Sequence, residues 1–149
     1  MQKQWSDVDN YLIENLIPGD TVLSLVLENN QRNGLPAHDV AANQGQLLAL
    51  FMRMVGAKSV LEIGTLGAYS TIWMARELPP GGRLITPEAG PLHARVAREN
   101  ITLAGLDKVV TLREGPALDS LATLEDAAPF DVILLMRISR ITLITCNGR

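Results

Sequence analysis

Cysteine and long apolar runs are scarce in this sequence, and each scarcity excludes a class of protein. The one cysteine, Cys146, cannot form an intrachain disulfide, so the chain does not resemble a disulfide-stabilised secreted domain. No apolar run approaches the roughly 20 residues of a membrane-spanning helix, and the first residues lack the apolar core of a signal peptide. We therefore expect a cytoplasmic protein with no membrane partner.

An excess of basic residues is also missing. The 13 Lys and Arg residues are outnumbered by 16 Asp and Glu residues, which gives a net charge of −3. Binding to nucleic acid requires clustered positive charge, so we expect no nucleic-acid partner. The 149 residues are 47% hydrophobic, which suffices for one domain with a real core.

Short apolar runs alternate with helical patterns from Lys58 onward. The expected strands cover residues 59–63, 83–86, 109–113 and 131–135. The expected helices between them cover residues 68–78, 91–104 and 118–124. Such alternation predicts an α/β fold with a parallel sheet that helices cover on both faces.

Three further helices are expected before this alternation, at residues 5–17, 20–27 and 43–55, with Ser6 and Asp20 as candidate N-caps of the first two. In the third helix we expect an inward apolar face made of Leu47, Leu50, Phe51 and Met54. The sequence thus divides into an N-terminal helical segment (1–57) and a segment of alternating strands and helices that begins at residue 58.

The run VLEIGTLGAYS, residues 60–70, carries the strongest functional signal. It combines a strand, a turn framed by Gly64 and Gly67, and a helix start, an arrangement in which backbone approaches a ligand closely. One acid, Glu62, precedes the turn, and a second, Glu88, ends the next strand. An acid in that second place typically binds ribose hydroxyls.

Two cofactor classes fit this layout, beside the alternative of an ordinary strand–helix turn. Dinucleotide folds use G-x-G-x-x-G to pack backbone against a pyrophosphate, but Thr65 stands where the close-approach glycine belongs. A glycine turn between two acids better suits S-adenosylmethionine, which has a ribose and an amino-acid end but no phosphate. A nucleotide-dependent oxidoreductase is therefore disfavoured.

Several further motifs occur with this one in a fixed order. They are Asn43–Leu48, Val60–Thr65, Tyr69–Ser70, Glu88, Ala97, Asn100, Ala104–Leu106, Gly115–Ala117 and Phe130–Asp131. Together they resemble the cation-dependent, S-adenosylmethionine-dependent O-methyltransferase family, which includes the catechol and caffeoyl-coenzyme A enzymes. The resemblance covers residues 35–134 and implies a Rossmann-like sheet of strand order 3-2-1-4, a phenolic acceptor, a divalent metal such as Mg²⁺ and a homo-oligomer.

The resemblance also implies roles for individual residues of the cofactor site. Their shared feature is a contact with S-adenosylmethionine: the methionine end near Val40, Ala41, Glu62, Gly64, Thr65 and Ser70, the ribose at Glu88 and the adenine at the Ala117 backbone. Each has a simpler alternative. Glu62 is also explained as a buried acid that neighbouring amides satisfy, Ser70 as a helix cap and Glu88 as a solvated acid before a turn.

Departures from the family pattern occur at Ala68, where glycine is usual, and at Pro87 and Gly90. A methyl group at Ala68 is expected to crowd the ligand. Neither His38 nor His93 has metal-ligand spacing, and His93 is expected on a solvated face.

The resemblance ends after Leu134. It therefore implies a truncated Rossmann-like domain that binds S-adenosylmethionine (58–135) and a tail outside the family pattern (136–149). The family continues with an Asp-Ala-Asp-Lys type sequence whose acid binds the metal, whereas this chain has Leu135–Arg140 and a short tail. Suitable codons for residues 135–148, read two bases later, encode Asp-Ala-Asp-Lys-Pro-Asn-Asn-Pro-His-Tyr-Leu-Gln-Trp, so we hypothesise a single-base deletion in the gene or its sequencing. We therefore assign no catalytic and no metal-binding residue to this chain.

Loss of the later family strands would leave the fourth strand as an exposed edge, which recruits other chains. The tail residues Ile138, Thr142, Leu143, Ile144 and Thr145 have strand character and are candidates to pair with an edge. Two functions follow as alternatives: an O-methyltransferase by family that lacks its metal and catalytic half, or a non-catalytic cofactor-binding or self-associating fragment.

Overall fold

The computed structural model describes residues 2–124, 127–137 and 140–145. The helices are α1 (Gln2–Leu16), α2 (Thr21–Arg32), α3 (Ala42–Val55), α4 (Tyr69–Ala75), α5 (Pro91–Leu103) and α6 (Ala117–Ala122). The strands are β1 (Ser59–Ile63), β2 (Arg83–Glu88), β3 (Val110–Glu114), β4 (Val132–Arg137) and β5 (Arg140–Thr145). No helix in the described part of the chain is long and apolar enough to cross a bilayer.

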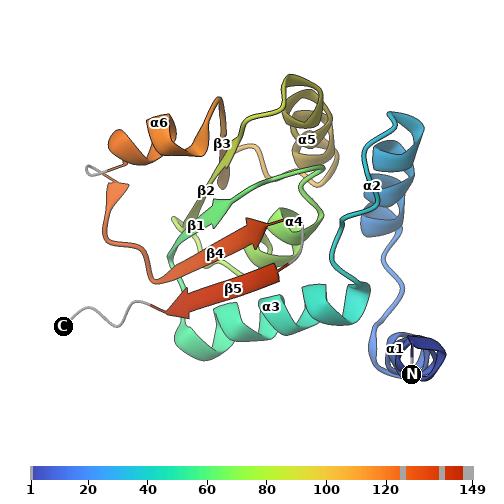
Figure 1. Ribbon diagram of the computed structural model, residues 1–149. Helices are drawn as coiled ribbons and strands as arrows, with labels where there is room; N and C mark the ends of the chain where they lie inside the picture. The colour runs from blue at the N-terminus through green and yellow to red at the C-terminus, as the bar shows by residue number, and fades with distance from the viewer. Residues whose placement is uncertain (1, 125–126, 138–139, 146–149) are drawn as a thin grey trace.

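The five strands form one sheet of order β3-β2-β1-β4-β5 (Figure 1). β3, β2, β1 and β4 are parallel, as expected for strands joined by helical crossovers, and β5 is antiparallel to β4. The predicted α/β fold and the strand order 3-2-1-4 are therefore confirmed. The order reverses at β1, because β2 lies on one side of this strand and β4 on the other.

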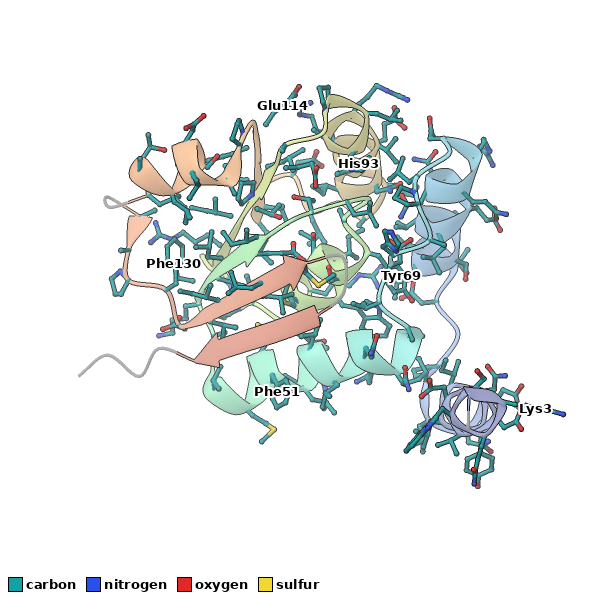
Figure 2. The ribbon with its side chains drawn as sticks, in the orientation of Figure 1. Lys3, Phe51, Tyr69, His93, Glu114 and Phe130 are labelled. Carbon is teal, nitrogen blue, oxygen red and sulfur yellow. The ribbon has the colours of Figure 1, made fainter. Side chains whose placement is uncertain are left out.

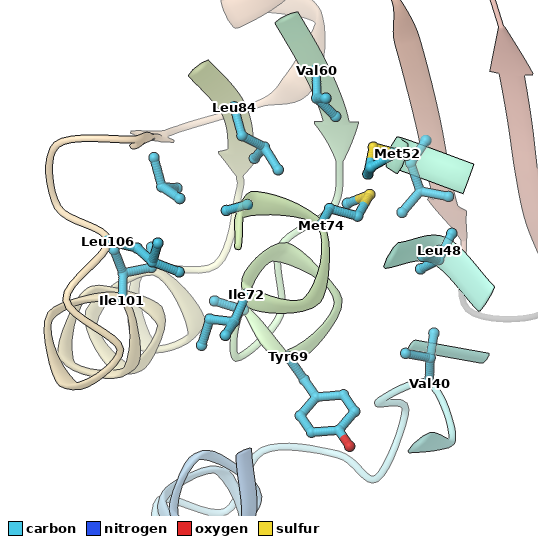
Figure 3. Packing of buried hydrophobic residues seen from close by; sticks show 14 of the residues in the cluster. Val40, Leu48, Met52, Val60, Tyr69, Ile72, Met74, Leu84, Ile101 and Leu106 are labelled. Atoms are coloured by element: carbon cyan, nitrogen blue, oxygen red, sulfur yellow. The ribbon is translucent and has the colours of Figure 1, made fainter. Parts of the chain in front are cut away.

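Alternate residues of the strands build two separate cores. Val60 pairs with Leu84 and with Val132, and this row faces a large core under α2, α3, α4 and α5 (Figure 3). The next residue, Leu61, faces the opposite way into a smaller core that Phe130 and the segment after α6 complete. Because both faces are covered, the strands read as continuous apolar runs.

The face that α3 turns inward differs from the expected one. Leu47, Leu50 and Met54 are 50%, 41% and 79% exposed, and of the expected four only Phe51 packs against the core. The buried residues are Gly45, Leu48, Ala49 and Met52. Both stripes repeat at helical spacing, so the periodicity alone did not select between them. Because Gly45 has no Cβ, the Trp73 ring approaches to within 2.3 Å of where that atom would lie, which brings α3 close to α4.

The helix N-caps were predicted with mixed success. Asp20 caps α2, since its side chain accepts a 2.9 Å hydrogen bond from the Leu23 N–H. Ser6 is not an N-cap, because α1 already begins at Gln2. Trp5 and Leu16 are each 66% exposed, so the apolar residues of α1 are only partly covered by the neighbouring α3.

The expectation of an exposed fourth strand is wrong. β5 covers that edge, with register pairs that run from Val132↔Thr145 to Arg137↔Arg140. The predicted strand character of the tail is confirmed over Arg140–Thr145, whereas Ile138 lies outside the described residues. Self-association through an exposed edge stays a prediction, and it now concerns β5 rather than β4.

Candidate cofactor-binding site

A cavity of about 320 Å³ opens at the carboxyl ends of the central strands. Its lining comes from the segment before α3, the β1–α4 turn, the ends of β2 and β4 and the first turn of α5, and consists of Pro36, His38, Gly64, Leu66, Glu88, His93 and Met136. In open α/β sheets, ligands bind at the strands' carboxyl ends, where the strand order reverses. The cavity occupies that place beside β1.

Gly64 brings backbone to the cavity wall because it has no side chain. Its φ is +94°, and a Cβ added there would lie 2.9 Å from the Met136 carbonyl oxygen at the end of β4. A larger residue at this position would therefore meet both backbone strain and a backbone clash. The tight approach of the turn to β4 is the structural reason for the glycine that the sequence motif contains.

Glu88 lies at the end of β2 and accepts hydrogen bonds from the backbone of the β1–α4 turn. One carboxylate oxygen accepts hydrogen bonds from the Thr65 and Leu66 N–H groups, at 3.1 and 2.8 Å, and the other accepts from the Gly90 N–H at 2.9 Å. A carboxylate has about four acceptor positions, so roughly one remains for a ligand. If Glu88 is to accept hydrogen bonds from both ribose hydroxyls, one of its hydrogen bonds from a backbone N–H must break.

Glu62 lies beneath the turn, on β1, with no exposure to solvent. It accepts hydrogen bonds from the hydroxyls of Ser70, at 2.6 Å, and Thr71. Burial raises the pKa of Glu62 to about 7, and the two hydroxyl hydrogen bonds oppose this shift only in part. The carboxyl group thus fixes the start of α4 from inside the fold.

The hydroxyl of Thr65 continues this layer. It lies 2.6 Å from the Thr86 hydroxyl and 3.3 Å from the Pro87 carbonyl oxygen, and both threonines are buried. Pro87 donates no backbone N–H, but its carbonyl is used twice, since it also accepts from the Gly64 N–H at 3.3 Å. The turn between β1 and α4 is therefore tied to β2 along its length.

The two histidines line the cavity, which corrects the expectation for His93. This residue is at the third position of α5 (Figure 2), and its Nδ1 is 3.4 Å from a Glu88 carboxylate oxygen. Because α5 starts just after β2, its first turn folds back over Glu88; the short spacing between Glu88 and Pro91 was the available signal. His38 reaches the cavity from the segment before α3.

The eight residues predicted to contact the cofactor separate into three groups. Gly64 and Glu88 line the cavity. Glu62, Thr65 and Ser70 form the hydrogen-bonded layer beneath it. The third group lies outside the lining: Val40 is buried ahead of α3, Ala41 is the N-cap of α3 and Ala117 begins α6. Sequence reasoning missed Pro36, Leu66 and Met136 as lining residues, because each carries an ordinary apolar side chain.

The residues present do not fit a divalent metal. No group of three His, Cys, Asp or Glu side chains within the described ranges is placed to hold an ion. β4 itself contains no acid, and Asp131, just before it, accepts hydrogen bonds from the Lys58 and Ser59 N–H groups at the opposite end of the sheet. Its carboxylate therefore supports β1 and lies far from the carboxyl ends.

An O-methyltransferase family model matches residues 19–137, which include every strand that lines the cavity. The chain belongs to the O-methyltransferase family. It is 46% identical over 133 residues to a catechol O-methyltransferase of Niastella koreensis, a match that covers 88% of this chain and 60% of the relative. The chain thus spans about 60% of that relative's length.

Solved structures of the family have the same fold. One from Klebsiella pneumoniae is 69% identical, with a TM-score of 0.87, and the match covers 89% of this chain and 60% of the other. The O-methyltransferase from Bacillus cereus, solved in complex with SAH, is 48% identical with a TM-score of 0.88; 91% of this chain and 63% of that chain are covered. This chain therefore shares the fold of these O-methyltransferase structures over about 60% of their length.

Proposed function

We propose that this chain binds S-adenosylmethionine in the cavity beside β1 and that the whole protein is an O-methyltransferase acting on a phenolic or catechol-type hydroxyl. The observation that carries the proposal is that Gly64, Glu88 and Met136, at the carboxyl ends of three adjacent strands, line one cavity. The complex of the Bacillus cereus relative with SAH supports the same ligand class.

Different residues of the chain would bind different parts of the cofactor. The Glu88 carboxylate would accept a ribose hydroxyl, and Gly64 would let the ligand approach the turn backbone. Glu62 and Ser70 would keep the start of α4 in place for the methionine end, with Val40 nearby, and Ala117 would offer backbone to the adenine. When bound, S-adenosylmethionine supplies an electrophilic methyl group on its sulfonium.

Equilibrium dialysis tests the cofactor class directly. We expect saturable binding of S-adenosylmethionine and of S-adenosylhomocysteine, and no binding of NAD at the same concentrations. NAD binding without S-adenosylmethionine binding would contradict the proposal, because it would revive the nucleotide-dependent oxidoreductase.

The alternative, a non-catalytic cofactor-binding fragment, is favoured by one observation. β4 ends in Leu135, Met136 and Arg137, and Glu88 is the one carboxylate among the described residues that line the cavity. We expect little or no methylation of catechol by this chain, with or without Mg²⁺. Turnover with Mg²⁺ would exclude the non-catalytic alternative.

A further inference from the structure

Three asparagines meet between α2, α5 and the β1–α4 turn. Asn100 of α5 is fully buried, and its Nδ2 donates to the Gly67 carbonyl oxygen and to Asn30 Oδ1, both at 2.8 Å. Its Oδ1 accepts from Asn29 Nδ2 at 2.9 Å. All hydrogen-bonding groups of the Asn100 amide are therefore used, which fixes its orientation.

The backbone around Gly67, whose carbonyl accepts from Asn100, is strained. Leu66 and Ala68, on either side of Gly67, have φ of 51° and 66°, in the left-handed region that residues with a Cβ rarely adopt. Such conformations persist only where the surroundings over-determine them. The hydrogen bond from Asn100 to the carbonyl between these two residues is a direct restraint on that conformation.

The same turn positions the carboxylate at the cavity. The N–H groups of Thr65 and Leu66 both donate to one oxygen of Glu88. A change in the turn's backbone would redirect these two N–H groups, and the Glu88 carboxylate would move with them. Asn100 is thus linked to Glu88 through the backbone, although it does not line the cavity.

A second arm of the cluster reaches the segment before α3. Asn30 is 2% exposed, and its Nδ2 donates to Asp39 Oδ1 at 3.0 Å. Asp39 directly precedes Val40. One network therefore connects the β1–α4 turn to the segment before α3, and both contribute residues to the cavity lining.

We propose that Asn100 is a positioning residue for the cofactor site: it holds the Gly67 turn, and through the turn the Glu88 carboxylate, in the binding geometry without touching the ligand. This inference rests on the proposed binding of S-adenosylmethionine. It predicts that removal of the Asn100 amide lowers cofactor affinity by more than its effect on folding explains.

The test compares Asn100→Leu, which removes the amide at similar volume, with Ile101→Ala, which creates a cavity in the same buried stretch of α5 without touching the turn. Both are titrated with S-adenosylhomocysteine under conditions in which circular dichroism shows each to be folded. We expect a loss of affinity of at least tenfold for Asn100→Leu and less than threefold for Ile101→Ala. Equal losses would overturn the inference. If Asn100→Leu does not fold, Asn29→Ala, which frees only one side of the amide, replaces it.

Amide hydrogen exchange in the ligand-free chain separates this inference from the proposed function. Asn100→Leu, or Asn29→Ala, should accelerate exchange of the Leu66 N–H relative to Ile101→Ala. A wild-type chain that binds no S-adenosylhomocysteine would refute the proposed function, while the exchange rates would still decide the positioning role. Unchanged exchange at Leu66 would overturn that role even if the wild-type chain binds.

Discussion

The Ser70 hydroxyl donates a 2.6 Å hydrogen bond to the carboxylate of Glu62, and both side chains lie inside the protein. The pair joins β1 to the first turn of α4, so the sequence motif that predicts a cofactor loop also explains how the loop is held. A buried acid satisfied by neighbouring amides was the simpler alternative for Glu62. The acid is buried, but its partners are the hydroxyls of Ser70 and Thr71 rather than amides. The predicted contact of Glu62 with the methionine end stays a prediction.

The raised pKa of Glu62 predicts a pH dependence of stability. Burial moves this pKa from 4.5 to about 7, so between these values the folded chain keeps a proton that the unfolded chain has lost. The contribution of Glu62 is thus fully present below about pH 4.5 and is lost as the pH rises towards 7, by at most about 1.4 kcal/mol per pH unit. Urea unfolding from pH 5 to 8 measures this change.

Glu62→Gln is the matched control, because glutamine retains the shape of the neutral acid and does not titrate. The difference in unfolding free energy between the two proteins isolates Glu62 from the other carboxylates. We expect this difference to shift in favour of Glu62→Gln as the pH rises. A difference that stays constant from pH 5 to 8 would contradict the burial argument.

The position of Gly67 has no room for a side chain. A Cβ built on it would lie 2.0 Å from Asn30 Oδ1, so Gly67→Ala must displace Asn30 from its bond with Asn100. We expect a destabilisation of about 1–3 kcal/mol, typical of overpacking. Urea unfolding of both single variants and the double variant with Asn30→Ala forms a cycle, in which the alanine at Gly67 should cost less once Asn30 is removed. Strict additivity would show that the two positions do not compete for space.

Asp131 supports the other end of the sheet. One of its oxygens accepts hydrogen bonds from the Lys58 and Ser59 N–H groups, at 2.8 and 2.9 Å. Because hydrogen bonds to a charged group contribute about 1.5–3 kcal/mol, Asp131→Ala should lower the unfolding free energy by that order and leave cofactor affinity unchanged. Asp107→Ala, which removes an exposed hydrogen bond to Thr102, is the control and should change stability little. A loss of cofactor affinity in Asp131→Ala would contradict this prediction, because it would show that the start of β4 affects binding at the cavity.

Local patterns predicted the strands well and the inward side of α3 poorly. β1 has the expected limits, since a buried strand bounded by turn residues is a local signal. In α3, by contrast, Leu47 and Leu48 belong to two apolar stripes of the same period, and only tertiary packing of Gly45 against Trp73 selects one. Helix periodicity identifies a helix but not which of two apolar faces becomes buried.

The candidate site shows the same division. Gly64 and Glu88 follow from the motif, whereas the link between Asn30 and Asn100 joins residues 70 positions apart and has no local pattern. Ala68 also needed the structure: its side chain is fully buried in the core, so the departure from the family's glycine concerns backbone conformation, with φ at 66°, rather than a methyl group in the cavity.

The most direct test of the account is calorimetric titration of the chain with S-adenosylhomocysteine, beside Glu88→Ala and Glu114→Ala. Glu114 pairs with Glu88 across β2 and β3 but is exposed and forms an ion pair with Arg98, so it controls for the loss of a carboxylate. We expect saturable binding by the wild-type chain and by Glu114→Ala, and an affinity about tenfold or more lower in Glu88→Ala, because a hydrogen bond to a charged group is lost. A folded wild-type chain that does not bind, or binding that Glu88→Ala leaves unchanged, would contradict the assignment of the cavity as the cofactor site.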